Sequence, residues 1–450
     1  MNTVILLVSH DCRLTGATPE LTGVLKKKLT LVNPKYRDAL KYARWIGKSL
    51  KKELHFYDLC GPDIRFPRGF ANQAVLLCRQ SGFEVTIEDK RRELPPMDLS
   101  FRGELRPYQQ AACSAMLARD FGVLEAATGS GKTVMAAAVI AGRKQPALIL
   151  VHTKELLYQW RERMEKFLGL TPGLIGDGSF APAPVTIGII HSVRKHLTKL
   201  PPLFGHIIVD EAHRTPSSMF TEIITRFDCR YMLGLTATPF RRDGLTELIG
   251  WHIGDLVHRV SGRELDRQGA VLKPIILQRP TSFTFNYRRN YHDLMTALTA
   301  NPARNELIVN DIVNEAAKDC GTVLVVSDRV SHCETICSML EQRGEQPLLL
   351  TGRTAGEERG EIVRRVQQGE VRVLVATIQL IGEGFDCPGL TSLFLCTPIK
   401  FEGRLTQVIG RILRPAVDKQ PMVYDYVDPV GVLKASARTR RQLYELTLVS

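Results

Sequence analysis

Short runs of aliphatic residues alternate with longer amphipathic stretches along most of this chain. The runs are rich in Val, Ile and Leu and have few polar interruptions, which favours strands that are covered on both faces. They fall into two series, one before and one after Ser261. The first series is Val123-Leu124, Ala147–Val151, Val185–Ile190, Ile207–Val209 and Tyr231–Leu235, and the second is Val323–Val326, Val371–Val375, Ser392–Cys396 and Met422–Tyr426.

The stretches between these runs have apolar residues at helical spacing. We predict helices at Lys154–Phe167, Asn305–Lys318, His332–Arg343 and Glu357–Gln368. Strands and helices that alternate in this way form parallel sheets with helices on both faces. The pattern therefore predicts an α/β protein with two doubly wound parallel sheets in tandem.

Breaks in the pattern divide the chain into three predicted domains. Arginines and prolines interrupt it at Arg91–Gly103, and Gly262, Gly269 and Pro274 interrupt it again. We expect a small N-terminal α/β accessory domain at residues 1–97, a first sheet domain at 98–265 and a second at 266–450. The opening run Val4–Val8 is too short to cross a bilayer and predicts a buried strand. We therefore expect a soluble, cytoplasmic protein without a membrane partner.

The charge of the chain favours one class of partner, and its cysteines bear on metal and redox sites. The 60 Lys and Arg residues exceed the 47 Asp and Glu residues and give a formal charge of +13, which favours a polyanionic partner. The ten cysteines contain no C-x-x-C pair, so the sequence offers no zinc or redox motif. We interpret the cysteines as buried or reduced thiols.

The segment Ala126–Thr133 reads A-A-T-G-S-G-K-T and lies between a predicted strand and a predicted helix. Glycines at this point let backbone N–H groups surround a phosphate, and a lysine neutralises its charge. The hydroxyl of Thr133 is suited to bind Mg²⁺. The pattern predicts a P-loop that binds ATP through Thr128, Gly129, Ser130, Gly131, Lys132 and Thr133.

A second acidic motif follows the strand Ile207–Val209 and reads D-E-A-H from Asp210 to His213. After a P-loop, paired carboxylates at a strand end predict a Walker B site. Asp210 is expected to hold Mg²⁺, usually through water. Glu211 is expected to orient and deprotonate the attacking water.

Together these motifs resemble the superfamily 2 helicases with a D-E-A-H box, and the resemblance extends from Leu105 to about Val430. It implies two RecA-like domains, with ATP hydrolysed at the cleft between them. Leu105–Gln109 resembles the family's Q-type motif, which implies that Arg106 and Gln109 lie near adenine. The resemblance also implies nucleic-acid contacts by Thr153, His191 and Ser192, and coupling of hydrolysis to movement by His213, Thr236 and Thr238.

In the second sheet domain, Thr377 and Gly382–Asp386 resemble motif V, and Gln407–Arg414 resembles motif VI. The resemblance implies that Thr377 contacts nucleic acid and that Asp386 belongs to the ATP site. The spacing of Gln407, Arg411 and Arg414 predicts that they share one helical face. Permanently charged guanidinium groups suit the charge of a transferred phosphoryl group, so we assign a catalytic role to Gln407, Arg411 and Arg414, with Lys132 and Glu211.

Within the superfamily the chain resembles the XPB and UvsW branch of DNA helicases. Phe240–Gly244 occupies the position of an Arg-Glu-Asp element, with Arg242 in place of the acid, and Arg242 is a candidate nucleic-acid contact. Through Leu29–Pro34, Phe56-Tyr57 and Phe66–Gly69, the N-terminal segment resembles that branch's accessory domain, which contacts duplex or branched DNA. The resemblance implies movement from 3′ to 5′ on single-stranded, forked or branched DNA, with a nuclease or a repair or recombination protein as a candidate partner.

Two alternatives remain open in the sequence. The N-terminal segment contains P-D at Asp63 and E-x-K from Glu88 to Lys90, the bare spacing of a metal-dependent nuclease. The chain would then be the motor subunit of a restriction or defence nuclease. The other alternative is an RNA helicase, for which RNA rather than DNA would stimulate hydrolysis of ATP.

Overall fold

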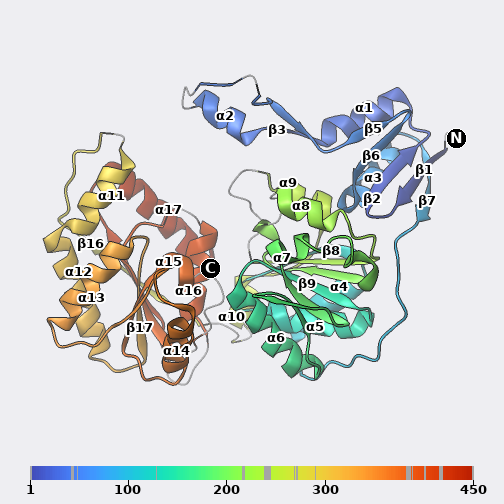
Figure 1. The fold of residues 1–450 in the computed structure, drawn as a ribbon. Helices are drawn as coiled ribbons and strands as arrows, with labels where there is room; N and C mark the ends of the chain where they lie inside the picture. The colour runs from blue at the N-terminus through green and yellow to red at the C-terminus, as the bar shows by residue number, and fades with distance from the viewer. Residues whose placement is uncertain are drawn as a thin grey trace. The chain divides into compact units, whose positions relative to one another are not determined.

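The computed structural model describes residues 3–41, 45–47, 49–127, 129–214, 218–237, 245–267, 269, 272–288, 290–381, 387, 389–399, 402–414 and 419–447. The chain divides into two compact units (Figure 1). The first contains Met1–Ala126 and Gly131–Val260, and the second contains Ala127–Ser130 and Ser261–Ser450.

The first unit is built on a large sheet with strand order β11-β10-β12-β9-β13-β14-β8-β15. Its strands pair in parallel except for β10 with β11. Every residue of β9 and β13 is buried, which explains their unbroken aliphatic sequences. The strands are β8 (Phe121–Ala126), β9 (Ala147–Val151), β10 (Gly173–Gly176), β11 (Ser179–Ala181), β12 (Val185–Ile189), β13 (His206–Val209), β14 (Tyr231–Thr236) and β15 (Leu256–Val260).

Helices connect these strands and start where the sequence caps them. The hydroxyl of Thr153, for example, accepts a hydrogen bond from the backbone N–H of Leu156 and so begins α6. The helical segments are α4 (Pro107–Leu117), α5 (Lys132–Arg143), α6 (Lys154–Leu168), α7 (Ile190–Arg194), η2 (Pro201–Leu203), η3 (Ala212–Arg214), α8 (Ser218–Ile224) and α9 (Glu247–Ile253).

The N-terminal part of the first unit has its own sheet, with strand order β5-β6-β2-β1-β7. A small pair of strands, β3 and β4, and helix α2 extend away from this sheet (Figure 1). Residues along β1 alternate between exposed and buried, so the predicted strand is only half covered. The elements are β1 (Thr3–Val8), β2 (Asp11–Thr15), α1 (Pro19–Lys28), β3 (Thr30–Val32), α2 (Pro34–Lys41), β4 (Glu53–His55), β5 (Asp58–Cys60), β6 (Asp63–Pro67), η1 (Arg68–Phe70), α3 (Ala71–Gln80) and β7 (Glu84–Asp89).

This N-terminal part, for which the sequence predicts an accessory domain, packs directly on α9 of the same unit. Trp251 and Leu248 of α9 lie in the same buried cluster as the core of the accessory domain, and the ring of Phe70 meets Trp251 edge to face. A Cβ atom at Gly69 would lie 2.3 Å from the carbonyl oxygen of Gly250, so only glycine fits this contact. The buried guanidinium of Arg68 donates to the carbonyl oxygen of Cys229, 2.7 Å away. We call this contact the accessory seam.

The second unit is built on a fully parallel sheet with strand order β16-β21-β20-β17-β19-β18. Its strands are β16 (Ile275–Pro280), β17 (Thr322–Ser327), β18 (Leu348–Leu350), β19 (Val373–Thr377), β20 (Leu390–Leu395) and β21 (Met422–Val427). Its helices are α10 (Gly262–Arg267), α11 (Tyr291–Ala300), α12 (Pro302–Ala316), α13 (Val330–Glu341), α14 (Gly356–Gln367), α15 (Ile378–Ile381), α16 (Glu402–Ile412) and α17 (Gly431–Thr447).

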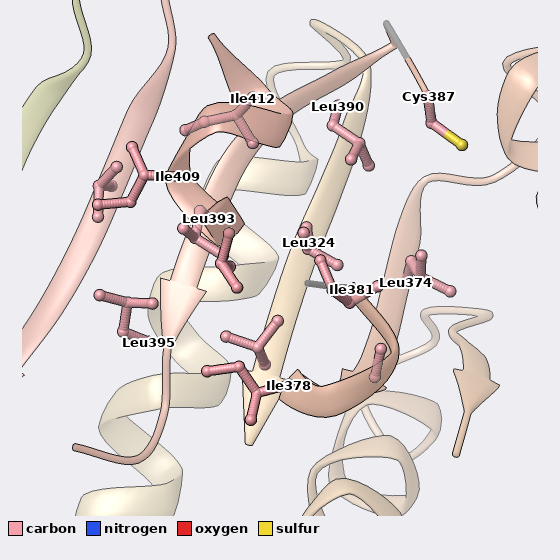
Figure 2. Close-up of a cluster of buried hydrophobic side chains, with 14 of the residues drawn as sticks. Leu324, Leu374, Ile378, Ile381, Cys387, Leu390, Leu393, Leu395, Ile409 and Ile412 are labelled. Carbon is pink, nitrogen blue, oxygen red and sulfur yellow. The ribbon is translucent and has the colours of Figure 1, made fainter. Parts of the chain in front are cut away.

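The core on one face of this sheet fixes α15 and α16. Ile378 and Ile381 of α15 and Ile409 and Ile412 of α16 are buried with leucines of β17, β19 and β20 (Figure 2). Burying each aliphatic side chain stabilises the fold by about 1.5–3 kcal/mol. This packing holds the backbone of α16, which contains much of the predicted motif VI.

The strand and helix predictions of both series are confirmed to within a few residues at their ends. One local prediction is wrong: α16 ends at Ile412, so Arg414 lies beyond the helix and does not continue the face of Gln407 and Arg411. All ten cysteines are free thiols, and burial raises the pKa of Cys333 and Cys337 to about 12. Within the described ranges, no helix has both the length and the hydropathy to cross a membrane.

Candidate active site

The P-loop residues connect β8 to the amino end of α5. Gly129 and Gly131 have φ angles of +86° and +81°, a region that residues with a Cβ seldom adopt. Helix α5 begins at Lys132, so its first backbone N–H groups face the end of this loop. The ammonium of Lys132 donates to the carbonyl oxygen of Ala126 at 3.0 Å. Thr133 is half-buried in the first turn of α5.

The Walker B carboxylates follow directly from the buried strand β13. The backbone N–H of Asp210 still bonds to Leu150 of β9, which keeps this residue in line with the sheet. One oxygen of Asp210 accepts from the backbone N–H of Glu211 at 2.9 Å. Burial, with the neighbouring Glu211, raises the pKa of Asp210 to about 6, while Trp160 and Lys132 act against this rise. The Asp210 carboxylate therefore lies in a buried setting in which a neighbouring carboxylate disfavours its charged form.

Two of the residues predicted to couple hydrolysis to movement are in contact. The Nδ1 atom of His213 lies 3.1 Å from the hydroxyl of Thr236 at the end of β14. The same Nδ1 atom lies 3.2 Å from a carboxylate oxygen of Glu211. His213 therefore joins the Walker B segment to the end of the neighbouring strand β14.

Gln109 of α4 lies against the P-loop. Its side-chain oxygen accepts from the backbone N–H of Arg106, and its amide nitrogen would lie 2.5 Å from a Cβ atom at Gly131. Gln109 is buried, whereas Arg106 lies at the exposed start of α4. The structure thus brings the predicted Q-type motif next to the P-loop glycine.

The three residues proposed for nucleic-acid contact in the first unit follow two neighbouring strands. β9 and β12 run in parallel with Val151 opposite Ile189, so their carboxyl ends meet at one edge of the sheet. Thr153 follows β9 as the cap of α6, and His191 and Ser192 follow β12 in α7. His191 is exposed, and Thr153 and Ser192 are half-buried.

The motif VI residues lie on and just after α16 of the second unit. Gln407 is buried, and the guanidinium of Arg411 donates to the carbonyl oxygen of Ile381 at 3.2 Å. Arg414 follows the helix, and its carbonyl oxygen accepts from the ammonium of Lys419. Thr377 ends β19 and is only 5% exposed, so its side chain contributes little surface to the edge of the sheet.

Four of the predicted site residues lie outside the described residues: Thr128, Thr238, Arg242 and Asp386.

The metal site proposed for the nuclease alternative is contradicted by the strand order of the accessory domain. Asp63 is in β6 and Glu88 is in β7, with β2 and β1 between them. Three strand spacings separate the two carboxylates by about 14 Å, too far for one metal ion to bind both. Asp63 instead accepts a hydrogen bond from Arg13 at 2.7 Å. Within the described part of the chain, no group of three or more His, Cys, Asp or Glu residues is arranged to hold a metal ion.

Trp160 belongs to this site, although the sequence patterns do not mark it. From the middle of α6 its indole N–H donates to the second oxygen of Asp210 at 2.7 Å. Trp160 is 2% exposed and Asp210 is 7% exposed, so the bond is shielded from water. A tryptophan at an apolar helical position is usually a core residue, and only the structure reveals its polar partner.

Comparison with known families matches both sheet domains. The family described as "Type III restriction enzyme, res subunit" matches residues 102–241, and the family described as "Helicase conserved C-terminal domain" matches residues 305–416. The chain belongs to the superfamily 2 helicases. This helicase is therefore an ATP-dependent enzyme with two RecA-like domains, each containing its share of the family's motifs.

Named relatives of this helicase are consistent with the XPB/UvsW-like branch. It is 28% identical over 396 residues to the DNA 3'-5' translocase XPB2 of Sulfurisphaera tokodaii. This match covers 80% of this chain and 90% of the relative. It is 23% identical over 451 residues to the ATP-dependent DNA helicase uvsW of Enterobacteria phage T4. This match covers 92% of this chain and 87% of the relative. Its fold is similar to that of S. cerevisiae Dbp5 bound to RNA and ADP BeF3, with a TM-score of 0.57, 16% identity and coverage of 75% and 86%.

Proposed function

We propose that this helicase is a DNA motor that uses ATP to move from 3′ to 5′ and acts on forked or branched DNA. One observation supports the proposal most. Five consecutive parallel strands, β8, β14, β13, β9 and β12, have their carboxyl ends at one edge of the sheet. At these strand ends lie the P-loop, Thr236, the Walker B residues, Thr153 and the residues where β12 meets α7. A nucleotide site and a nucleic-acid site would thus share one edge of a rigid sheet.

The residues at one end of this edge fit a nucleotide and its magnesium ion. The left-handed glycines and the start of α5 provide a cradle for phosphates, with Lys132 as the cation. Asp210 and Thr133 would hold Mg²⁺, and Gln109, which lies against the P-loop, is the proposed adenine contact. Bound Mg²⁺ neutralises negative charge on the phosphates. Glu211 is the proposed base for the attacking water, and Arg411 is the proposed cation for the transferred phosphoryl group.

The named relatives support DNA and the direction of movement. The relative from Sulfurisphaera tokodaii is a DNA 3'-5' translocase by name, and it matches 90% of its own length. The phage relative is named a DNA helicase and matches across 92% of this chain. We therefore favour DNA over RNA as the track and a DNA repair or recombination context, with a nuclease or a protein of that context as partner.

The accessory domain supplies a basic surface suited to duplex phosphates. Between residues 26 and 52 the single acidic residue is Asp38, and the basic residues cluster on both sides of α2. Among the described residues of this segment, those with exposed basic side chains are Lys27, Lys28, Lys35, Arg37, Lys41, Lys51 and Lys52. Trp45 is 89% exposed beside them, which suits stacking on an unpaired base. We call residues 26–52 the basic arm.

A comparison of polynucleotides tests the proposal. The rate of ATP hydrolysis is measured with single-stranded DNA, duplex DNA, forked DNA and RNA, and streptavidin displacement from either end of a single strand gives the direction. We expect DNA to stimulate more than RNA, a fork to stimulate most, and streptavidin to leave the 5′ end, which a 3′-to-5′ motor reaches. Lys132→Ala serves as the inactive control, because it removes the cation of the P-loop. Stronger stimulation by RNA would favour an RNA helicase, and displacement from the 3′ end would reverse the proposed direction.

A further inference from the structure

The side chain of Trp160 makes a contact that its burial alone does not require. Helix α6 buries one stripe of residues, Leu157, Trp160, Met164 and Leu168, against the sheet. An aliphatic or phenyl side chain would fill an apolar position in such a stripe. An indole adds an N–H group, which must find a partner when it is buried. That partner is a carboxylate oxygen of Asp210, 2.7 Å away.

The two oxygens of Asp210 are held from two different elements. The backbone N–H of Glu211 donates to Oδ1 at 2.9 Å, and Trp160 donates to Oδ2 at 2.7 Å. Each bond fixes one oxygen, so the pair fixes the plane of the carboxylate. A carboxylate has about four lone-pair directions, so both oxygens keep acceptor capacity for a further ligand.

We infer that Trp160 is a positioning residue for Asp210: its indole N–H orients the carboxylate for Mg²⁺ bound with the nucleotide. The inference rests on the proposed role of Asp210 as the magnesium ligand. Residues that hydrogen-bond to a metal ligand set its orientation, and losing one typically weakens metal binding about 10- to 100-fold.

The location of Trp160 makes its bond to Asp210 rigid. Asp210 is anchored to β9 by its backbone bond to Leu150, and only two residues separate the end of β9 from the start of α6. Trp160 lies seven residues after the helix cap Thr153, which is about 10 Å along the helix axis. Asp210 is therefore held by β9 through its backbone and by α6 through its side chain. Because α6 directly follows β9 in the chain, these two supports are themselves connected.

The substitution Trp160→Phe tests the inference, because it keeps an aromatic ring and removes the N–H group. Binding of a fluorescently labelled ADP is followed while Mg²⁺ is titrated. We expect the Mg²⁺ concentration for half-maximal effect to rise by about 10-fold or more, with little change in binding measured without Mg²⁺. Trp251→Phe is the matched control, since it removes a buried indole at the accessory seam, and it should leave the midpoint unchanged.

Asp210→Asn separates the inference from the proposed function. If the Asp210→Asn protein responds to Mg²⁺ like the unsubstituted protein, Asp210 is not the magnesium ligand, and the proposed role of that residue fails. If Asp210→Asn changes the Mg²⁺ concentration for half-maximal effect and Trp160→Phe does not, the inference about Trp160 is overturned and the proposed function stands.

Fluorescence provides a test that leaves Trp160 in place. The chain contains three tryptophans, so Trp45→Phe with Trp251→Phe leaves Trp160 as the single reporter. If its N–H bonds to the magnesium ligand, adding Mg²⁺ to the protein bound to ADP should shift its emission spectrum. An identical spectrum with Mg²⁺ and with EDTA would contradict the inference, even if the Trp160→Phe protein failed to fold.

Discussion

Glu211 has a φ angle of +52°, which places a residue with a side chain in the left-handed region. Such a conformation costs about 1 kcal/mol or more and persists only where neighbours enforce it. Here the buried strand β13 holds one side, and the backbone bond to Asp210 and the contact with His213 hold the other. The strain turns the chain sharply at the sheet edge, so the two adjacent carboxylates take different environments.

Glu211→Gln should separate binding of ATP from its hydrolysis. The amide keeps the shape of the side chain but cannot accept the proton of the attacking water, so turnover should fall about 100-fold or more. Nucleotide affinity should change little. Equilibrium binding and single-turnover hydrolysis measure the two effects. Glu162→Gln, an exposed position on α6, is the control, and unchanged hydrolysis in Glu211→Gln would remove Glu211 as the base.

Arg411→Ala should reduce hydrolysis about 100-fold with a smaller loss of nucleotide affinity, since its proposed contact is strongest in the transition state. The substitution also removes the bond to Ile381, so thermal unfolding must be measured beside activity. Arg438→Ala, which replaces an exposed arginine of α17, is the control. Equal losses of binding and turnover would assign Arg411 a structural role.

At the scale of elements, the accessory seam is a tightly packed contact that the sequence did not predict. A glycine, two aromatic rings and a buried arginine meet there. The strands and long helices could be predicted, because burial on both faces leaves an unbroken aliphatic signature in strands such as β9 and β13. Packing between domains depends on shape, and shape leaves no periodic pattern in the sequence.

The candidate site likewise contains residues that a sequence motif predicts and a residue that no motif predicts. Lys132, Asp210 and Glu211 follow from motif spacing, because their chemistry allows few other residue types. Trp160 could not be predicted, since its position also satisfies the apolar stripe of α6. The spacing of Arg414 predicts a place on the helical face, but α16 ends two residues earlier. Helix ends depend on capping and packing that the spacing of three polar residues does not encode.

Gly69→Ala should destabilise the first unit by about 1–3 kcal/mol, because backbone atoms of α9 surround the position and cannot yield as a side chain would. Gly23→Ala is the matched control. Gly23 lies within α1 with open space around it, so alanine should be neutral or stabilise by about 0.5–1 kcal/mol. Denaturant unfolding measures both, and equal stabilities of the two variants would contradict the tight seam.

At the scale of the whole molecule, the seam determines how the accessory domain can be studied. All nucleotide motifs lie at or after Arg106, so deleting residues 1–95 would leave them intact in sequence. The deletion would, however, expose Trp251 and Leu248 of α9, which are 4% and 3% exposed in the full chain. Weaker DNA binding by a truncated protein could then come either from lost DNA contacts or from the newly exposed apolar surface. Point substitutions in the full chain separate these two causes.

Lys27→Gln with Lys28→Gln should weaken binding to forked DNA and flatten its dependence on salt. If both lysines contact phosphates, the slope of log affinity against log salt concentration should decrease by about 2. Lys144→Gln with Lys166→Gln removes two exposed lysines that follow α5 or lie near the end of α6, and it should leave the slope unchanged. Equal slopes for the two double variants would remove the basic arm from DNA binding.

The accessory seam also makes this helicase convenient for optical measurement. Because Gly69 and Arg68 fix the accessory sheet against the rest of the first unit, a dye attached to that sheet reports the position of the unit. A second dye on an exposed position of α17 would report the other unit. Energy transfer between the two dyes would then record each step of the motor as a change in one distance, without a label near the catalytic residues.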